Sequence, residues 1–401
     1  MKKTTLTTTL GILSLLTVLL EPSTGQIMEV TNELQERIIS DVRDHTIERA
    51  DRYLRKEPVT VTAKVSERSA GGPNDFYSEG DYWWPNPNDP DAPFIRRDGE
   101  RFTDRFEHDR LVMRDFAEYT AALTSAWLLT GEQRYADHAL VHLNAWFINP
   151  ETMMNPHMLC AQAIQGRVTG RDIGLIDAYH LVEVAQSARA LVKTNAIPNE
   201  EAEKIKDWFN RFITWMTTHE YGLSEMRRYN NHATTWAVTA SAMARFAGNE
   251  EVMELARNRF KEILPDQMNA DGGFPRELRR TKPYSYSLFN LDAFANLAFI
   301  LSTPEDNLWA YETDDGKSLQ LGMDFLIPYI EDKSAWPYAE DIDIHDKWPV
   351  RHSLLLFAGL AWQDASYIDL FLQFDPDPTH PEVLRNHPVR HPVIWMEDLF
   401  R

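Results

Sequence analysis

The sequence predicts an all-α protein, built as an (α/α) toroid or incomplete barrel of antiparallel helix hairpins. Apolar residues recur at three- to four-residue spacing in one stretch after another from about residue 111 onward. Short connectors separate these stretches, and no strand-like stretch of note lies between them. Such a succession of helix pairs favours a ring in which inner helices line a central cleft.

The segments with helical periodicity span residues 111–131, 135–148, 174–193, 200–220, 232–248, 250–268, 287–302, 318–332 and 351–362. The connectors TGEQR, IPNEE and AGNEE carry a glycine or proline followed by acidic residues. Glycine and proline suit helix ends, and acidic residues suit the first turn of the next helix. Each connector is short, so neighbouring helices are expected to run antiparallel.

The amino terminus predicts a secretory leader over residues 1–25. Lys2 and Lys3 precede an apolar stretch at 10–20 and small residues at 23–25. The apolar stretch is shorter than the roughly 18 residues that a membrane anchor needs. We therefore expect a secreted or periplasmic protein without membrane contact after cleavage. Residues 26–401 are expected to form a single domain, since no linker interrupts 70–375.

The formal net charge of −20 argues against a nucleic acid or an anionic membrane as partner, because neutralising phosphates requires a basic face. An anionic substrate would need a local basic cluster, and the run RELRRTK at 276–282 is the dense candidate. Cys160 is the only cysteine, so no internal disulfide forms and packing must hold the fold.

An aromatic segment at 69–100 lacks any period and is rich in Gly, Pro, Asn and Asp. We expect a loop over the cleft. Its aromatic rings either bury against the toroid or cover a substrate, since Tyr and Trp faces stack on sugar rings. The candidate sugar platforms are Tyr82, Trp83 and Trp84.

Two helix starts carry the polar groups that suit catalysis. Asn230, Asn231 and His232 precede one apolar helix, where one asparagine is expected to cap the helix and leave the second amide over. About fifty residues later, the segment 271–294 places a Gly-Gly turn, a basic run and a Tyr-Ser-Tyr cluster before another helix.

An amide, an imidazole, a guanidinium and a phenol together fit β-elimination in a uronic acid polymer. Removing the C5 proton leaves a carbanion beside a carboxylate, whose charge donors must first neutralise. A tyrosine then transfers a proton, with its pKa lowered by a cation such as Arg280. The reaction needs neither a metal nor a cofactor.

The chain resembles the alginate lyase superfamily of α/α-toroid polysaccharide lyases over roughly residues 70–365. The resemblance rests on NNHATTW, GGFPRELRRTKPYSYSLFNL, DFYSEGDYWWPNP and AQAIQGRVTGRDIGLIDA. It implies Tyr286 as general acid, and as base too in a syn elimination, with His232 as base in an anti elimination. By the same resemblance, Asn231 and Arg280 hold the carboxylate and support Tyr286.

Further assignments follow less directly. Arg279 competes with Arg280, and Tyr284 competes with Tyr286. The other candidate substrate-binding residues are Asn230, Gln162, Gln165, Arg167 and Arg171. His138 and His142 have the i, i+4 spacing of metal ligands but lack an H-E-x-x-H pattern, so no metal site is predicted.

The favoured substrate is alginate, an anionic polysaccharide of mannuronate and guluronate, cleaved to 4,5-unsaturated ends. One alternative is a glucuronan lyase of the same fold. Another is an α/α-toroid glycoside hydrolase, which needs paired carboxylates. For that reaction the acids available are Asp172, Asp177, Asp341 and Asp343. The last alternative is a uronan-binding protein without turnover.

Overall fold

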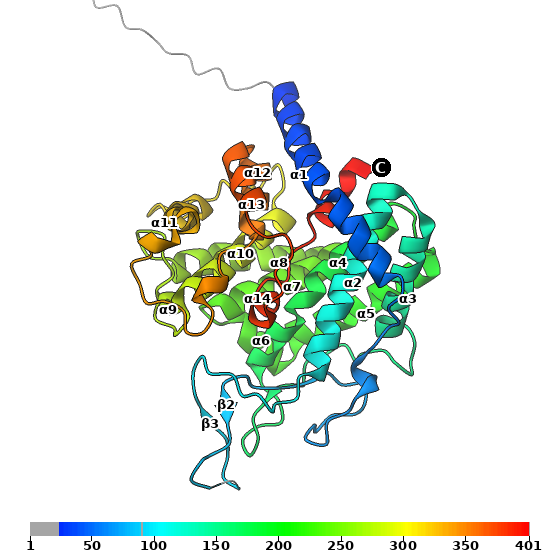
Figure 1. Cartoon of the computed structure of the whole chain (residues 1–401), viewed down its shortest axis with the longest axis vertical. Coiled ribbons are helices and arrows are strands. Elements are labelled where there is room, and N and C mark those ends of the chain that lie inside the picture. Colours follow the sequence, from blue (N-terminus) through cyan, green and yellow to red (C-terminus); the bar gives the residue numbers. More distant parts are fainter. Residues whose placement is uncertain (1–23, 90, 401) are drawn as a thin grey trace, which may run out of the picture.

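A computed structural model describes residues 24–89 and 91–400 of the chain (Figure 1). The predicted helical segments are helical in it. The α-helices are α1 (Thr24–Tyr53), α2 (His108–Thr130), α3 (Gln133–Phe147), α4 (Leu181–Lys193), α5 (Asn199–Thr218), α6 (Glu220–Met226), α7 (Asn231–Ala247), α8 (Glu250–Gln267), α9 (Pro275–Leu278), α10 (Pro283–Leu301), α11 (Leu319–Glu331), α12 (Ser353–Trp362), α13 (Ala365–Gln373) and α14 (Pro381–Asn386). The 3-10 helices are η1 (Val61–Ala63), η2 (Asp172–His180), η3 (Lys333–Ala335), η4 (His345–Lys347) and η5 (Pro392–Phe400). The predicted leader at 1–25 lies outside the described residues except for its last two.

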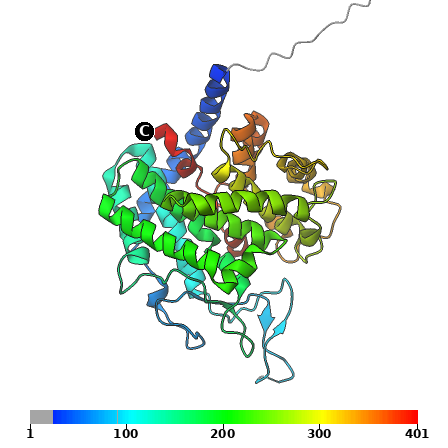
Figure 2. The same cartoon turned by 180° about the vertical axis from the view of Figure 1, so that it is seen from behind.

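The helices pair into hairpins that follow one another around a ring, which confirms the α/α toroid. The inner helices α2, α4, α7, α10 and α12 pack each against the next. Behind them lie the outer helices α3, α5, α8, α11 and α13, as Figures 1 and 2 show from opposite sides. Helix α1 packs along α2 and also touches α12 and α13, so it spans the gap between the two ends of the ring.

Burial separates the two rings. Almost every residue of α10 is buried, and even its polar side chains are bonded inside: Asn290 donates to Gln267 and Asn296 to Tyr179. Outer helix α5 buries one stripe only, with Ile205, Trp208 and Phe212 against the core. A helix that is apolar all round belongs inside, whereas an amphipathic helix covers it.

The predicted connectors end and start helices as expected. Gly131 and Gly248 follow α2 and α7 with φ of 70° and 74°, and their N–H groups bond back to Trp127 O and Ala244 O. Positive φ costs glycine nothing, which explains its place at these ends. Asn249 then caps α8 by accepting from Val252 N.

Three features depart from the sequence expectation. The helix predicted at 174–193 divides into η2 and α4, and helices α1, α9, α13 and α14 form where no helical segment was predicted. Two short strand pairs also form: β1 (Tyr77–Glu79) runs parallel to β4 (Cys160–Ala163), and β2 (Trp83–Trp84) runs antiparallel to β3 (Ile95–Arg96). Strands of two to four residues are too short to show alternation, and they anchor the aromatic segment to the ring.

The carboxyl-terminal segment returns to the ring. Helix η5 packs against α2 and α4, and α14 lies just before it. Across the part of the chain that the structure describes, no helix combines the length and the apolar character needed to cross a bilayer.

Candidate active site

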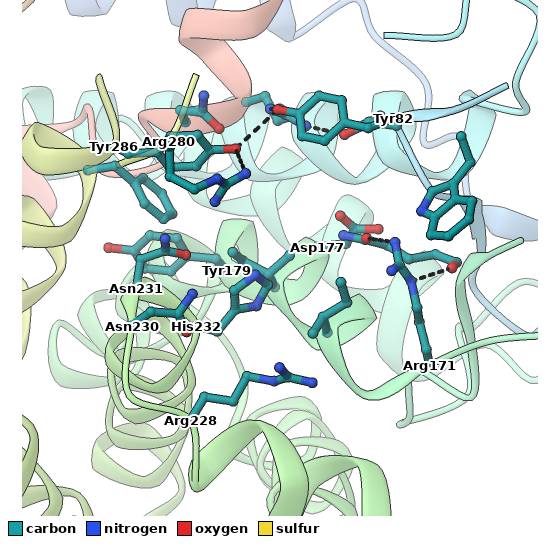
Figure 3. A pocket seen from close by; sticks show the side chains of 18 of the residues that line it. Tyr82, Arg171, Asp177, Tyr179, Arg228, Asn230, Asn231, His232, Arg280 and Tyr286 are labelled. Carbon is teal, nitrogen blue, oxygen red and sulfur yellow. Dashed lines mark hydrogen bonds and ion pairs between the residues drawn. The ribbon is translucent and has the colours of Figure 1, made fainter. Parts of the chain in front are cut away.

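The N-terminal ends of inner helices α7 and α10 meet at a cleft with a cavity volume of about 310 Å³. Helix η2, strand β4, helix α14 and the aromatic segment complete its walls (Figure 3). The lining residues are Asp81, Tyr82, Trp83, Arg96, Gln162, Arg171, Ile173, Ile176, Asp177, Tyr179, His180, Arg228, Asn230, Asn231, His232, Arg280, Tyr286, Phe289, Arg385 and Asn386.

Helix α7 is not capped by either asparagine, so that expectation is wrong. Asn230 occupies the N-cap position without a side-chain cap bond. The carboxylate of Glu277, on α9, instead accepts from Asn231 N at 2.9 Å and from Asn231 Nδ2 at 2.7 Å. The remote carboxylate therefore orients the amide of Asn231 and leaves its second N–H free to donate. Burial raises the pKa of Glu277, although its bonds to Asn231 oppose that shift.

His232 lies next to a buried carboxylate. Its Nδ1 is 2.5 Å from Oε1 of Glu225, a residue of α6 that is 1% exposed in its side chain. A carboxylate only accepts, so Nδ1 carries the proton and Nε2 is left with a lone pair. The other oxygen of Glu225 lies 3.0 Å from Nε of Arg228. This arrangement fixes the ring and stabilises an imidazolium once Nε2 takes a proton.

Tyr286, in the first turn of α10, faces the cleft from the other helix start. Its hydroxyl accepts from Nη2 of Arg280 at 3.1 Å, and the guanidinium carbon lies 4.1 Å from the centre of its ring. The hydroxyl of Tyr82, from the aromatic segment, lies 3.1 Å from that of Tyr286. Arg280 also pairs with Asp98 at 3.4 Å. The guanidinium and the phenol thus form one unit.

The expectation of a lowered tyrosine pKa is wrong for this cleft. Burial raises the pKa of Tyr286 well above its ordinary value, and the neighbouring Tyr82 adds to the rise. The cations Arg280 and Arg385 act in the opposite direction but do not prevail. Tyr286 therefore keeps its proton at neutral pH, which is the state a general acid needs.

The carboxylates that line the cleft are engaged by arginines. Oδ1 of Asp81 accepts from Nη1 of Arg110 at 2.9 Å, and Asp81 also pairs with Arg385. These and other nearby arginines hold the pKa of Asp81 well below the usual range. Asp177 accepts from Nε of Arg110 at 2.9 Å and from the hydroxyl of Ser78 at 2.6 Å. Asp81 is therefore ionised at neutral pH, and Arg110 contacts both carboxylates.

Arg171 is a cation without an ion-pair partner among the described carboxylates. Its Nε donates to Gln162 O and its Nη2 to Gln162 Oε1, both at 2.9 Å. Burial, followed by the repulsion of Arg110, lowers its pKa to about 10. A Cβ on Gly80 would approach Arg171 Nη2 to 2.9 Å, so glycine leaves room for the guanidinium. Arg171 can therefore receive an anion in the cleft.

The aromatic segment contributes two of its three candidate platforms to the lining. Tyr82 and Trp83 border the cleft. The guanidinium carbons of Arg167 and Arg171 lie 5.3 and 5.9 Å from the centre of the Trp83 ring. Trp84 does not line the cleft, because its Nε1 donates to Glu100 O and it packs on Phe102.

Four other candidates also lie outside the lining. Tyr284 is buried in the core, where its hydroxyl donates to Tyr329 O at 2.8 Å. Gln165 donates to Tyr77 and Glu79, and Arg167 donates to Phe94 O. Arg279 forms the C-cap of α9. By contrast, Asn230, Asn231, His232, Gln162, Arg171, Arg280 and Tyr286 all come together at the cleft.

Sequence reasoning missed residues that only the fold brings in. Arg385 belongs to the short helix α14, where it bonds Glu382 at 2.9 Å and lies 3.4 Å from the hydroxyl of Tyr82. No local pattern marks it. Glu277 lies inside the quoted RELRR run, and Glu225 lies seven positions before His232, so an unexplained acid beside each motif was the available signal.

Comparisons with known proteins agree with this architecture. The sequence model of the family described as alginate lyase matches residues 60–336. A search among curated proteins finds no match.

Solved structures extend the likeness to nearly the whole chain. An alginate lyase from Bacteroides ovatus is 28% identical, with 93% of this chain and 97% of that chain covered and a TM-score of 0.75. Alginate lyase A1-III from Sphingomonas species A1 is 17% identical, with 81% and 88% covered and a TM-score of 0.52, which shows the fold alone. A variant of A1-III was solved in complex with a tetrasaccharide, at 14% identity, 86% and 89% coverage and a TM-score of 0.53.

Proposed function

The chain belongs to the alginate lyase family, and on that premise we propose how its cleft cleaves a uronic acid polymer by β-elimination. A member of this family is a polysaccharide lyase that acts on alginate. The observation that carries the mechanism is the meeting of two helix starts. One presents a protonated phenol held by Arg280, and the other presents an imidazole nitrogen backed by Glu225.

The first requirement is to neutralise the uronate carboxylate. The free amide N–H of Asn231 is oriented by Glu277, and Arg280 supplies positive charge nearby. Such preorganised donors stabilise the charge that develops on the carboxylate when C5 loses its proton. Arg171 is separated from this group along the wall of the cleft (Figure 3) and suits the carboxylate of another sugar in the chain.

The proton transfers divide between the two helix starts. Nε2 of His232 takes the C5 proton, and the C5–H electrons form the C4=C5 double bond. The bond from C4 to the glycosidic oxygen breaks, and Tyr286 protonates that oxygen as it leaves. Positioned acid and base groups contribute roughly 10²- to 10⁴-fold each to such a reaction.

Sugar stereochemistry sharpens this division. In mannuronate and glucuronate the C5 hydrogen and the C4 oxygen lie on the same face of the ring, whereas in guluronate they lie on opposite faces. An imidazole base and a separate phenol acid suit the opposite-face case. The same-face case would need Tyr286 as base too, and its raised pKa opposes that role. Loss of His232 should therefore affect cleavage of polyguluronate more than that of polymannuronate.

A glycoside hydrolase reaction fits this cleft less well. It needs one carboxyl with a raised pKa beside a second carboxylate. Of the acids considered for it, Asp341 bonds the first turn of α10, and Asp172 pairs with Arg228. Asp177 is bonded to Arg110, and Asp343 does not line the cleft. The lining holds no candidate general acid of the carboxyl type among the described residues.

The deciding experiment follows the ultraviolet absorbance of the new C4=C5 double bond on polymannuronate, polyguluronate and glucuronan in parallel. A rise on either alginate block supports the proposal, and a rise on glucuronan alone would reassign the substrate. Reducing ends without absorbance would indicate hydrolysis. Binding of polymer without either signal would indicate a uronan-binding protein.

We also infer that the protein acts in the periplasm or outside the cell, on the strength of the predicted leader and an extracellular type of substrate. Fractionation of producing cells with amino-terminal sequencing tests this inference. Cleavage near residue 25 supports it. An intact amino terminus in the cytoplasmic fraction would contradict it.

A further inference from the structure

A buried group of one carboxylate and two imidazoles lies apart from the cleft lining. Asp292 belongs to α10, His352 directly precedes α12, and His387 directly follows α14. Their residues are 5%, 1% and 3% exposed. One candidate ligand atom from each lies within 4.8 Å of the other two. These residues are far apart in sequence, which is why no spacing motif marks them.

One buried polar atom of this group lacks a hydrogen-bond partner in the described part of the chain. Oδ1 of Asp292 accepts from Ser353 Oγ at 3.0 Å and from Leu354 N at 2.8 Å, and Oδ2 lies 2.5 Å from Nδ1 of His352. The remaining ring nitrogen of His352, Nε2, is buried and has no hydrogen-bond partner among the described residues. Buried polar atoms are nearly always partnered, so this nitrogen requires an explanation.

A hydrogen bond with the backbone of Arg351 orients the ring of His387. Metal-bound histidines commonly use one nitrogen for such a backbone bond and the other for the metal. His387 also borders a second cavity of about 50 Å³, lined in part by Asp41 and His45.

We propose that Asp292, His352 and His387 form a structural site for a zinc-class divalent cation. A carboxylate oxygen with two imidazole nitrogens is a donor set that such cations favour, and water can complete the coordination. A bare Asp–His ion pair would explain Asp292 and one nitrogen of His352. It leaves the second imidazole and the orphaned Nε2 without a purpose.

The site would join three parts of the chain, two of which contribute residues to the active-site cleft. Asp292 lies on the same helix as Tyr286, and His387 lies two residues after Arg385. Arg385 and Tyr286 both line the cleft. A cation bridging α10, the start of α12 and the segment after α14 would hold Arg385 in place against the ring. No step of the elimination passes through this cation, so the site stands independently of the proposed function.

The test loads untagged purified protein with zinc, dialyses it, and measures the metal retained per chain by mass spectrometry. Thermal unfolding is recorded with and without zinc and after chelation. We expect about one retained zinc per chain and a Tm that rises with zinc and falls with chelator, since a cation that binds only the folded state stabilises it. Retention of less than about a tenth of an equivalent, with a Tm indifferent to zinc, would overturn the proposal.

Two variants and a control locate the site. His387→Gln keeps an N–H for the Arg351 backbone, and Asp292→Asn keeps an oxygen for Leu354 N, but each weakens the donor set. Both should lose retained zinc and its effect on Tm. The control is His142→Gln, which removes a buried histidine of the i, i+4 pair with His138 and should retain zinc like the native chain. Zinc retained equally in His387→Gln would overturn the assignment.

A measurement on the native protein covers the case in which the variants do not fold. X-ray absorption at the zinc edge reports the atoms bound to the metal. Two imidazole nitrogens with oxygen donors support the site. A sulfur ligand, or a shell of water alone, contradicts it.

Discussion

Three inner and three outer helices of the ring differ in how their first backbone N–H groups are satisfied. The outer helices α8, α11 and α13 are capped by the side chain that directly precedes them: Asn249, Ser318 and Asp364. The inner helices α7, α10 and α12 receive carboxylates from distant parts of the chain: Glu277, Asp341 and Asp292.

Remote capping leaves the side chains at the inner helix starts free for other work. At α7 it releases Asn231 and His232 toward the cleft, and at α10 it releases Tyr286. Helix α2 shows the reverse exchange, since its first-turn Asp109 bonds Tyr77 N in β1 and not its own helix. The helices that carry the catalytic residues are therefore capped by carboxylates from other elements. Substitutions of the capping residues and of the catalytic residues can test the two roles separately.

The largest effect is expected from Tyr286→Phe. Because Asp341 caps α10, the variant should fold normally while kcat falls by up to roughly 10⁴-fold for want of the acid. Double-bond absorbance measures kcat, and thermal unfolding measures the stability of the variant. The matched control is Tyr284→Phe in the same turn, whose hydroxyl bonds Tyr329 O in the core. That control should lose about 1 kcal/mol of stability and keep its kcat. The reverse outcome would exchange the roles of the two tyrosines.

The next largest effect on kcat is expected from Glu225→Gln. The imidazolium formed on His232 loses its negative partner, so kcat should fall by roughly 10²-fold. In a His232→Ala background the same substitution should cost little further rate, which a merely structural role would not produce. Glu220→Gln, an exposed position on the same helix, is the control. A further roughly 10²-fold loss in the His232→Ala background would show that Glu225 does not act through His232.

Asp341→Ala compared with Asn249→Ala separates a borrowed cap from a local one. Asp341 accepts from Tyr284 N and Ser285 N, both at 2.8 Å, so its loss should cost about 2 kcal/mol and also reduce kcat by shifting Tyr286. Loss of Asn249 should cost about 1 kcal/mol and leave kcat unchanged. Denaturant unfolding measures the loss of stability in each variant, and steady-state rates measure the loss of kcat. If Asp341→Ala and Asn249→Ala changed kcat equally, a cap from a distant residue would have no special role in catalysis.

The smallest effect concerns pH and Asp109. Burial raises the pKa of Asp109 to about 7. A carboxyl whose pKa is raised by folding favours the folded state at low pH, and that contribution is lost as pH rises through the folded pKa. Between pH 6 and 8 the native chain should therefore lose about 1.4 kcal/mol relative to Asp109→Asn. Urea unfolding at both pH values measures the difference, and parallel stabilities would refute the raised pKa.

Much of the fold was predictable because its signals are local. Helical periodicity, the glycines after α2 and α7, and Asn249 before α8 all act within a few residues of the structure they determine. The asparagine cap at α7 was predicted wrongly because the group that accepts from the first turn, Glu277, belongs to another element and leaves no local signal.

The sequence by itself therefore determined the ring helices other than α13, their order around the ring, and the two motifs that bring Asn231, His232, Arg280 and Tyr286 to the cleft. Only the tertiary structure decided that Tyr286 and not Tyr284 faces the cavity, that Glu225 and Glu277 orient the other helix start, and that Arg385 reaches the cleft. The physical reason is range. A helix forms from contacts three and four residues apart, whereas burial, borrowed caps and ion pairs depend on which segments the closed ring brings together.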